Sequence, residues 1–151
     1  YFSQKASDPM SADYQIVQVD NPGQSAWGII GQGISDYNQQ QAGEGSQGQV
    51  LCYALQGPDE VIVGGVIGII YWDWLSVDLL WIKAELRGRG FGQRLLALVE
   101  DEARRRGATH AHLDTFSFQA PEFYKKLGYR VFGELPNFPA EHTRYYFTKE
   151  L

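Results

Sequence analysis

The residues with the clearest chemical potential form the stretch Arg87-Gly88-Arg89-Gly90-Phe91-Gly92. Its three glycines let the backbone turn tightly and approach a ligand without an intervening Cβ. A helix is predicted directly after it, and the first N–H groups of a helix are unpaired and attract anions. The guanidinium groups of Arg87 and Arg89 add positive charge that suits phosphate. The pattern therefore predicts a phosphate-binding turn between a strand and a helix.

Two better-known phosphate motifs do not fit this turn. The sequence contains no Gly-x-x-x-x-Gly-Lys-Ser/Thr loop of the kind that binds nucleoside triphosphates. At the turn, the dinucleotide motif Gly-x-Gly-x-x-Gly is incomplete, because no third glycine stands at the required place. A glycine-rich turn can also be a plain connection, so its function has to be judged from the elements around it.

Length and composition indicate one compact domain with a real core. The chain has 151 residues, of which 44% are hydrophobic and 21% are charged. A net charge of −5 and a pI near 5.1 argue against nucleic acid as the main partner. Acidity weakly favours a cationic small molecule or a basic peptide as ligand. We expect a single domain at residues 10–151 and interpret residues 1–9 as a tag remnant or a disordered start, since Met10 would make a natural first residue.

Cysteine content and hydropathy favour a cytoplasmic protein. The single Cys52 cannot form an internal disulfide, which fits a reducing compartment. The longest apolar run, at residues 61–71, contains glycines and is too short to cross a membrane. The first residues are polar, so we expect no signal peptide and no membrane partner.

Periodicity predicts one helix and four strands before the turn. Residues 14–19 alternate apolar and polar side chains, which predicts a first strand. Residues 21–41 carry large apolar side chains at helical spacing, but internal glycines weaken this helix and predict that it is broken or mobile. Three further strands are predicted at residues 50–55, 60–72 and 75–83, in an antiparallel meander.

After the turn, the pattern predicts two helices and three strands. The helices are expected at residues 93–106 and 122–127, the second of them opened by a proline. The strands are expected at residues 110–116, 129–135 and 143–148. The predicted fold is α/β (α+β), with a mixed, mostly antiparallel sheet of about seven strands flanked by helices.

Two motifs, separated by one helix and one strand, carry a family resemblance. Arg87, Gly90 and Gly92 fit the pattern Arg-x-x-Gly-x-Gly, and residues 123–129 read Phe-Tyr-Lys-Lys-Leu-Gly-Tyr. Both resemble signatures of the GNAT superfamily of N-acetyltransferases, and the order of elements from about residue 60 to residue 151 is also similar. The resemblance implies a GNAT-like acyl-CoA N-acyltransferase fold and an acetyl-CoA-dependent N-acetyltransferase.

The resemblance implies acetyl-CoA as cosubstrate and a path for it. Backbone N–H groups from Leu86 to Gln93 would bind the pyrophosphate of coenzyme A, flanked by Arg87 and Arg89. The pantetheine arm would pair with the preceding strand almost as an added β-strand, where that strand splays from its neighbour at a bulge. The implied cofactor-binding residues are Leu80, Trp81, Ile82, Lys83, Arg87, Gly88, Arg89, Gly90, Phe91, Gly92, Gln93, Ser117 and Tyr124.

The family also implies a catalytic role for Tyr124, whose hydroxyl would protonate the thiolate that leaves the thioester. Phe123 and Leu127 lie one turn apart and are predicted to form the buried stripe of their helix. Tyr124 is rotated from Phe123 by about 100°, which favours a functional role. Ser117 stands where many relatives have an Asn that binds the pantetheine, so its contact with the cofactor is an open question.

The remaining roles are those of a base and an acceptor pocket. The resemblance suggests Asp78 as the base that takes the proton of the amine, with a water chain as the alternative. A strand N–H near Ile82 would hold the oxyanion. Aromatic side chains could bind a cationic amine through cation–π contacts. The predicted acceptor-binding residues are Trp27, Tyr71, Trp72 and Trp74. The three histidines do not have the spacing of a metal site, so no metal is expected.

Three interpretations of the function are open at this point. An acetyltransferase that moves acetyl to a primary amine of a small molecule or peptide, by direct attack in a ternary complex, explains both motifs. A non-catalytic acyl-CoA-binding or sensing module would keep the phosphate-binding turn without needing Tyr124. A protein-interaction domain would need neither motif and would expose its aromatic side chains. The sequence leaves open the identity of the acceptor and whether the C-terminal strands pair in a homodimer.

Overall fold

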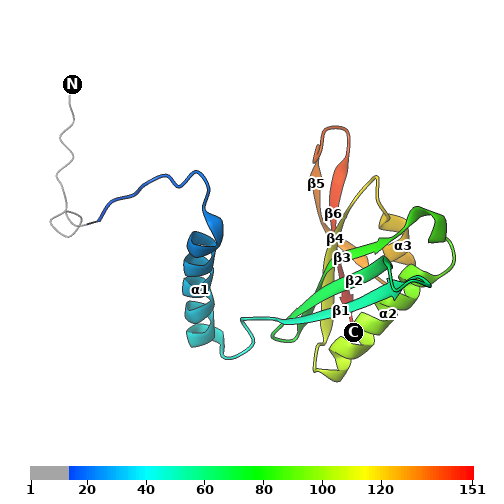
Figure 1. Cartoon of the computed structure of the whole chain (residues 1–151), viewed down its shortest axis with the longest axis horizontal. Coiled ribbons are helices and arrows are strands. Elements are labelled where there is room, and N and C mark those ends of the chain that lie inside the picture. The colour runs from blue at the N-terminus through cyan, green and yellow to red at the C-terminus, as the bar shows by residue number, and fades with distance from the viewer. Residues whose placement is uncertain (1–13) are drawn as a thin grey trace. The chain divides into compact units, whose positions relative to one another are not determined.

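The computed structural model describes residues 14–151, so the predicted tag remnant at residues 1–9 lies outside the described residues. The chain divides into two compact units, one that ends at Tyr37 and a second from Asn38 to Leu151. The second unit contains the whole sheet, the two later helices and the predicted phosphate-binding turn (Figure 1). The expectation of a single domain from residue 10 onward stays a prediction.

Helix α1 (Gly23–Ala42) is continuous, so the predicted break is wrong. Each internal glycine costs about 1 kcal/mol relative to alanine, and this helix keeps its geometry in spite of that cost. None of its residues is buried, and Trp27 is 72% exposed. The strand predicted at residues 14–19 does not form, because these residues pair with no strand of the sheet. Alternation alone does not make a strand without a neighbour that bonds its backbone groups.

The second unit is built on one six-stranded sheet with the order β1-β2-β3-β4-β6-β5. Its strands are β1 (Gln49–Gln56), β2 (Ile62–Tyr71), β3 (Trp74–Ile82), β4 (His110–Phe116), β5 (Arg130–Pro136) and β6 (Thr143–Glu150). Neighbouring strands are antiparallel, except that β3 and β4 are parallel and are connected through helix α2 (Phe91–Arg105). The predicted mixed, mostly antiparallel sheet is confirmed, with six strands in place of about seven.

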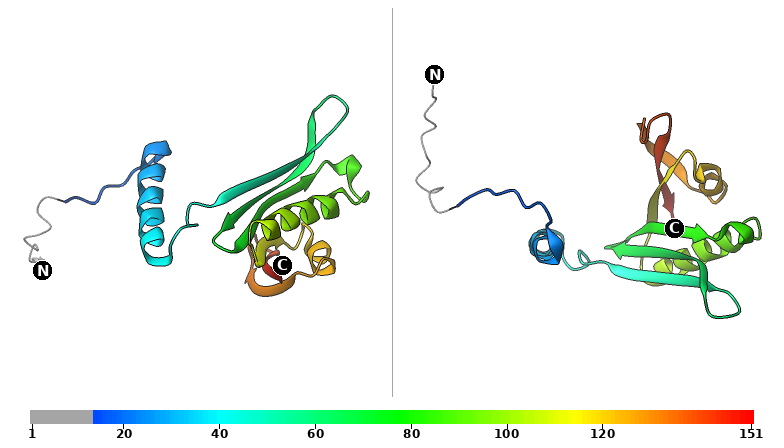
Figure 2. Two further views of the ribbon diagram at one scale, coloured as in Figure 1. Left: turned by 90° about the horizontal axis from the view of Figure 1, so that it is seen from below. Right: turned by 45° about the horizontal axis from the view of Figure 1, so that its top comes forward.

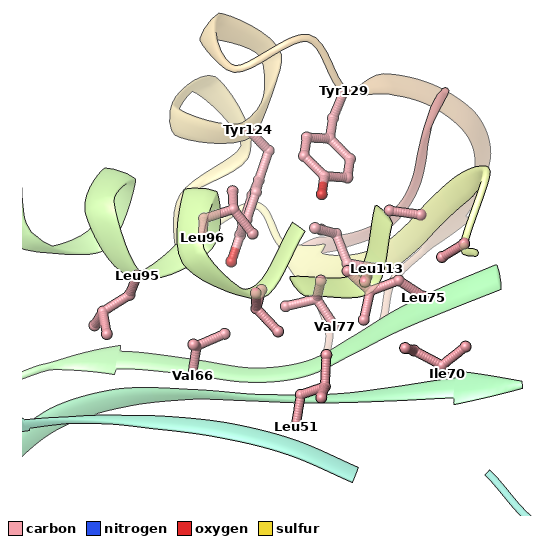
Figure 3. Close-up of a cluster of buried hydrophobic side chains, with 14 of the residues drawn as sticks. Leu51, Val66, Ile70, Leu75, Val77, Leu95, Leu96, Leu113, Tyr124 and Tyr129 are labelled. Carbon is pink, nitrogen blue, oxygen red and sulfur yellow. The ribbon is translucent and has the colours of Figure 1, made fainter. Parts of the chain in front are cut away.

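Helix α2 packs against the sheet and supplies one side of its core (Figure 2). Its buried positions recur at helical spacing, so one stripe faces β1, β2 and β3 while the opposite face lies in solvent. The largest fully buried side chains are Phe147, Ile70, Leu75, Leu96, Val66 and Val99. Figure 3 shows this cluster, with Tyr124 of α3 (Pro121–Lys126) and Tyr129 of the following segment reaching into it.

One ion pair is buried next to this core. Lys149 Nζ lies 2.8 Å from Oε2 and 3.0 Å from Oε1 of Glu100, and only 6% of the Glu100 side chain is exposed. The Tyr129 hydroxyl donates to the same carboxylate at 3.5 Å. The sequence pattern puts Glu100 among the polar positions of α2, whereas the fold buries it. A buried charge is tolerated when a partner and hydrogen bonds offset its desolvation, and β6 brings that partner here.

Strands β3 and β4 separate partway along their length. They pair from Trp74 to Ser76 of β3 and no further, while β3 stays paired with β2 as far as Ile82. The register of β2 and β3 shifts by one residue at Asp78, which has no partner on β2 and forms a β-bulge. The bulge and the separation implied by the family resemblance are therefore present, and they leave one edge of β3 free of strand pairing.

Candidate active site

The predicted phosphate-binding turn joins a short 3-10 helix (Ala84–Leu86) to α2. Gly88 and Gly90 have φ angles of 77° and 84°, which glycine adopts without the strain that a side chain would bring. The first backbone bond of α2 runs from Arg94 N to Gly90 O at 3.1 Å. The backbone N–H groups of residues 91–93 come before this first bond and have no carbonyl partner within the helix. They are therefore available to an anion at the helix N-terminus.

A cavity of about 770 Å³ opens beside this turn, between the free edge of β3 and the segment that follows β4. Its lining contains most of the residues that the family resemblance assigned to the cofactor or to the reaction. Those residues are Asp78, Leu80, Trp81, Ile82, Arg87, Gly88, Gly90, Phe91, Gly92, Gln93 and Tyr124. A cavity of this size can hold much of an extended ligand. The fold therefore brings both sequence motifs to one site.

The basic side chains near the turn have different surroundings. Arg87 Nε donates to the carbonyl oxygen of Ile82 at 3.0 Å, which holds this guanidinium at the end of β3 beside the cavity. Arg89 is exposed and does not line the cavity. Lys83 pairs with Glu85 at 2.8 Å and also lies outside the lining. Of these three basic side chains, Arg87 is the one whose residue lines the cavity.

Tyr124 is the buried residue of α3 and also lines the cavity. Only 8% of its surface is exposed, whereas Phe123 and Leu127 are only partly buried. Phe123 and Leu127 do pack against the core, but the most buried position of this helix is Tyr124, which packs against Phe147 of β6 and enters the core itself. The Tyr124 hydroxyl has no hydrogen-bond partner among the described residues. No buried side-chain nitrogen or oxygen atom of those residues lacks a partner, so this hydroxyl is accessible, and Tyr124 lines the cavity.

The environment of Tyr124 keeps its hydroxyl protonated. Burial, and then the charge of Asp114, raise the pKa of Tyr124 to about 12. At neutral pH the phenol therefore carries its proton, which is the state that a general acid needs. This protonation state agrees with the role that the family resemblance implies for this residue.

Asp78 lies at the β-bulge and lines the cavity. The Ser76 hydroxyl donates to Oδ1 of Asp78 at 2.5 Å. Within residues 14–151, its Oδ2 atom has no hydrogen-bond partner. A bulge changes the face to which a strand residue points, and here it brings a carboxylate to the place where β3 and β4 separate. One oxygen of this carboxylate is thus available to a ligand.

The sequence motifs include neither the end of β4 nor the segment that connects it to α3, and both line the cavity. Their lining residues are Asp114 and Thr115 of β4, then Phe118, Gln119 and Ala120 of the connecting segment. Asp114 is held by Arg144, whose Nε and Nη2 atoms each lie 2.7 Å from its Oδ2 atom. Arg144 in turn lies 5.3 to 5.4 Å from the centroids of three aromatic rings. The available signal was the position of this segment, directly before the motif that contains Tyr124.

Ser117 does not line the cavity. Its hydroxyl accepts a hydrogen bond from Thr143 N at 3.1 Å and lies 3.3 Å from His142 Nδ1. These contacts connect the end of β4 to the start of β6. The geometry thus gives Ser117 a structural role, and the predicted cofactor contact finds no support in it.

The aromatic residues predicted to bind the acceptor do not gather at the cavity. Tyr71, Trp72 and Trp74 lie at the β2–β3 connection, and the ring centroids of Trp74 and His110 are 4.5 Å apart. None of the three lines the cavity, because it opens at the other end of β3. Trp27 belongs to the first unit, and its role stays a prediction.

Within the described range 14–151, no three His, Cys, Asp or Glu side chains lie close enough together to hold a metal ion. Among the helices of the same range, none has both the length and the hydrophobicity of a membrane span.

The known proteins most informative for this chain are acetyltransferases. Residues 18–129 match the model of the acetyltransferase (GNAT) family. The chain is 43% identical over 91 residues to the blasticidin-S acetyltransferase of Streptomyces morookaense, a match that covers 60% of this chain and 67% of that protein. It is also similar to the crystal structures of two acetyltransferases. One is from Bacillus cereus, with 32% identity and a TM-score of 0.79, and the match covers 89% of this chain and 98% of that one. The other is from Agrobacterium tumefaciens, with 28% identity and a TM-score of 0.85, and the match covers 91% of this chain and 100% of that one. With this match and the two motifs in one cavity, the chain belongs to the GNAT family of acetyltransferases.

Proposed function

We propose that the protein transfers the acetyl group of acetyl-CoA to a primary amine of a small molecule. The observation that carries this proposal is one cavity that connects the phosphate-binding turn at Gly88 and Gly90 with the accessible hydroxyl of Tyr124. The diphosphate of coenzyme A would accept hydrogen bonds from the N–H groups at the start of α2. The pantetheine arm would follow the free edge of β3 toward Tyr124.

The proposed reaction is direct attack within a ternary complex. The protonated amine first gives a proton to Asp78 or to a water chain. The lone pair of the neutral amine then forms a bond to the acetyl carbonyl carbon, and the carbon–sulfur bond breaks. The thiolate takes a proton from the Tyr124 hydroxyl, and the surplus proton on the new amide nitrogen passes to water. A β3 backbone N–H near Ile82 would stabilise the oxyanion of the tetrahedral intermediate.

The cavity chemistry favours a small cationic acceptor. Asp78 and Asp114 line the cavity, and each has one carboxylate oxygen without a hydrogen-bond partner among the described residues. Carboxylates attract a protonated amine before it loses its proton. Similarity to an acetyltransferase named for the antibiotic blasticidin-S supports a small-molecule amine as acceptor.

The proposal predicts binding of acetyl-CoA and of free coenzyme A. Either compound should raise the melting temperature of the protein in a thermal-shift assay, because a ligand that binds only the folded state stabilises it. An amine panel that includes small diamines, guanidino amines and short peptides, assayed by release of free thiol, would then identify the acceptor. No shift with either compound would exclude the proposed function, whereas a shift without turnover on any amine would favour a non-catalytic acyl-CoA-binding module.

A glycine of the turn offers a second test. Gly90→Ala should raise the KM for acetyl-CoA about tenfold, because an alanine is strained at a φ of 84° and the turn must change shape. Gly107→Ala is a matched control, since this glycine also has a positive φ, of 96°, and also has no atom near the added Cβ, but lies past the other end of α2. The control should lose stability and keep its KM. Equal KM values in the two variants would exclude a role of the turn in cofactor binding.

A further inference from the structure

Gln119 is held in the cavity wall by a short chain of hydrogen bonds. The backbone N–H of Ala120 donates to Thr115 Oγ1 at 3.4 Å, and that hydroxyl donates to Gln119 Oε1 at 3.2 Å. The backbone N–H of Phe116 donates to the same Oε1 atom at 2.9 Å. Thr115 is only 2% exposed, so the base of this chain lies inside the protein.

These contacts distinguish the oxygen of the Gln119 carboxamide from its nitrogen. A backbone N–H can only donate, so the atom that Phe116 N contacts has to be the carbonyl oxygen. Since Thr115 Oγ1 accepts from Ala120 N, its own hydrogen is free to donate to that same oxygen. The amide nitrogen, Nε2, is therefore the outer end of the side chain. It has no hydrogen-bond partner within residues 14–151, and Gln119 lines the cavity.

From this geometry we infer that Gln119 Nε2 donates a hydrogen bond to an amide carbonyl of the pantetheine arm, an inference that rests on the proposed use of coenzyme A. The residue lies between β4 and α3, across the cavity from the free edge of β3. A ligand that pairs with β3 on one side presents the rest of its amide groups to the opposite wall. An uncharged N–H donor fits a neutral carbonyl better than it fits a phosphate.

In this assignment, Gln119 makes the side-chain contact with the pantetheine arm that the sequence analysis considered for Ser117. The hydroxyl of Ser117 is used by Thr143 N and lies against His142, and the residue is not part of the lining. Gln119 has the longer side chain, and the hydrogen bonds to its Oε1 atom fix the position of its Nε2 donor. Gln119 is thus a positioning residue that orients the cofactor arm beside Tyr124, without contact to the reacting proton.

The test compares two ligands on Gln119→Glu. One oxygen of the glutamate can keep the bonds from Phe116 and Thr115, while the second oxygen replaces the N–H₂ donor with an acceptor. Binding of coenzyme A should weaken about 10- to 100-fold, because a donor is lost and two acceptors face each other. Binding of adenosine 3′-phosphate 5′-diphosphate, which has the same nucleotide but no pantetheine, should change less than about twofold. Isothermal titration calorimetry measures both affinities.

Gln49→Glu is the matched control, because it adds the same charge on edge strand β1, outside the cavity lining. It should leave both affinities unchanged. Equal weakening of the two ligands by Gln119→Glu would mean a distorted site and would overturn the inference. So would an unchanged affinity for coenzyme A with a lower kcat, which would assign Gln119 to the reacting carbonyl. Failure of the unaltered protein to bind coenzyme A would overturn the proposed function as well, so the two failures are distinguishable.

Discussion

Replacing Tyr124 with phenylalanine is expected to lower kcat on the order of 100-fold, while the affinity for coenzyme A changes little. The substitution keeps the ring that packs against Phe147 and removes only the hydroxyl that is accessible from the cavity. Without that proton donor, the thiolate must leave unprotonated or take its proton from water. Steady-state kinetics with an acceptor from the amine panel, together with calorimetric titration of coenzyme A, would measure both quantities.

Tyr129→Phe is the control for this experiment. Tyr129 is also a buried tyrosine, its ring lies 5.8 Å from that of Tyr124, and its hydroxyl donates to Glu100. Loss of the Tyr129 hydroxyl should leave kcat close to that of the unaltered protein. If Tyr124→Phe turned over as fast as the unaltered protein, Tyr124 would be a packing residue, and the general acid would have to be a water molecule.

Because the pKa of Tyr124 is raised, Tyr124→Phe should also change how the free energy of unfolding depends on pH. The folded state favours the neutral phenol, so the contribution of this group to stability is fully present below its ordinary pKa of about 10. That contribution is lost as the pH rises through the folded pKa of about 12. Tyr124→Phe should therefore lose less stability between these two pH values than the unaltered protein does. Urea unfolding at a series of alkaline pH values would measure the difference.

Lys149→Met is expected to lower the free energy of unfolding by about 3–5 kcal/mol. The substitution leaves the Glu100 carboxylate without its cationic partner in a place where only 6% of its side chain reaches solvent. The remaining hydrogen bond, from the Tyr129 hydroxyl at 3.5 Å, is too long to offset the lost ion pair. Urea-induced unfolding monitored by circular dichroism would measure the change.

Two further variants separate a buried charge from the general effect of removing a lysine. Lys125 makes an exposed ion pair with Glu122, so Lys125→Met should change the free energy of unfolding by less than about 1 kcal/mol. Adding Glu100→Gln to Lys149→Met should restore part of the loss, because an amide costs less to bury than an unpaired carboxylate. Equal effects of the two lysine substitutions would show that the Glu100 pair is no more important than a surface pair.

Local patterns in the sequence were sufficient for the turn and for most of the elements around it. The glycines of the turn, the apolar stripe of α2 and the proline that opens α3 act through neighbouring residues, so their effect is visible without the fold. The same is true of the motif around Tyr124, which identified the residue whose hydroxyl the cavity exposes. The strand expected at residues 14–19 failed for the opposite reason, since a strand depends on a distant partner.

The tertiary structure alone decided which polar residues share an environment. Asp114 near the end of β4 and Gln119 after it belong to no recognisable pattern, and they become cavity residues only because β3 and β4 separate after Ser76. Glu100 was expected at a polar helix position and is buried because β6 brings Lys149 within 2.8 Å of it. Burial, pairing and the pKa of a side chain depend on residues far away in the chain, so a local reading of the sequence could identify the phosphate-binding turn but not the opposite wall of the site.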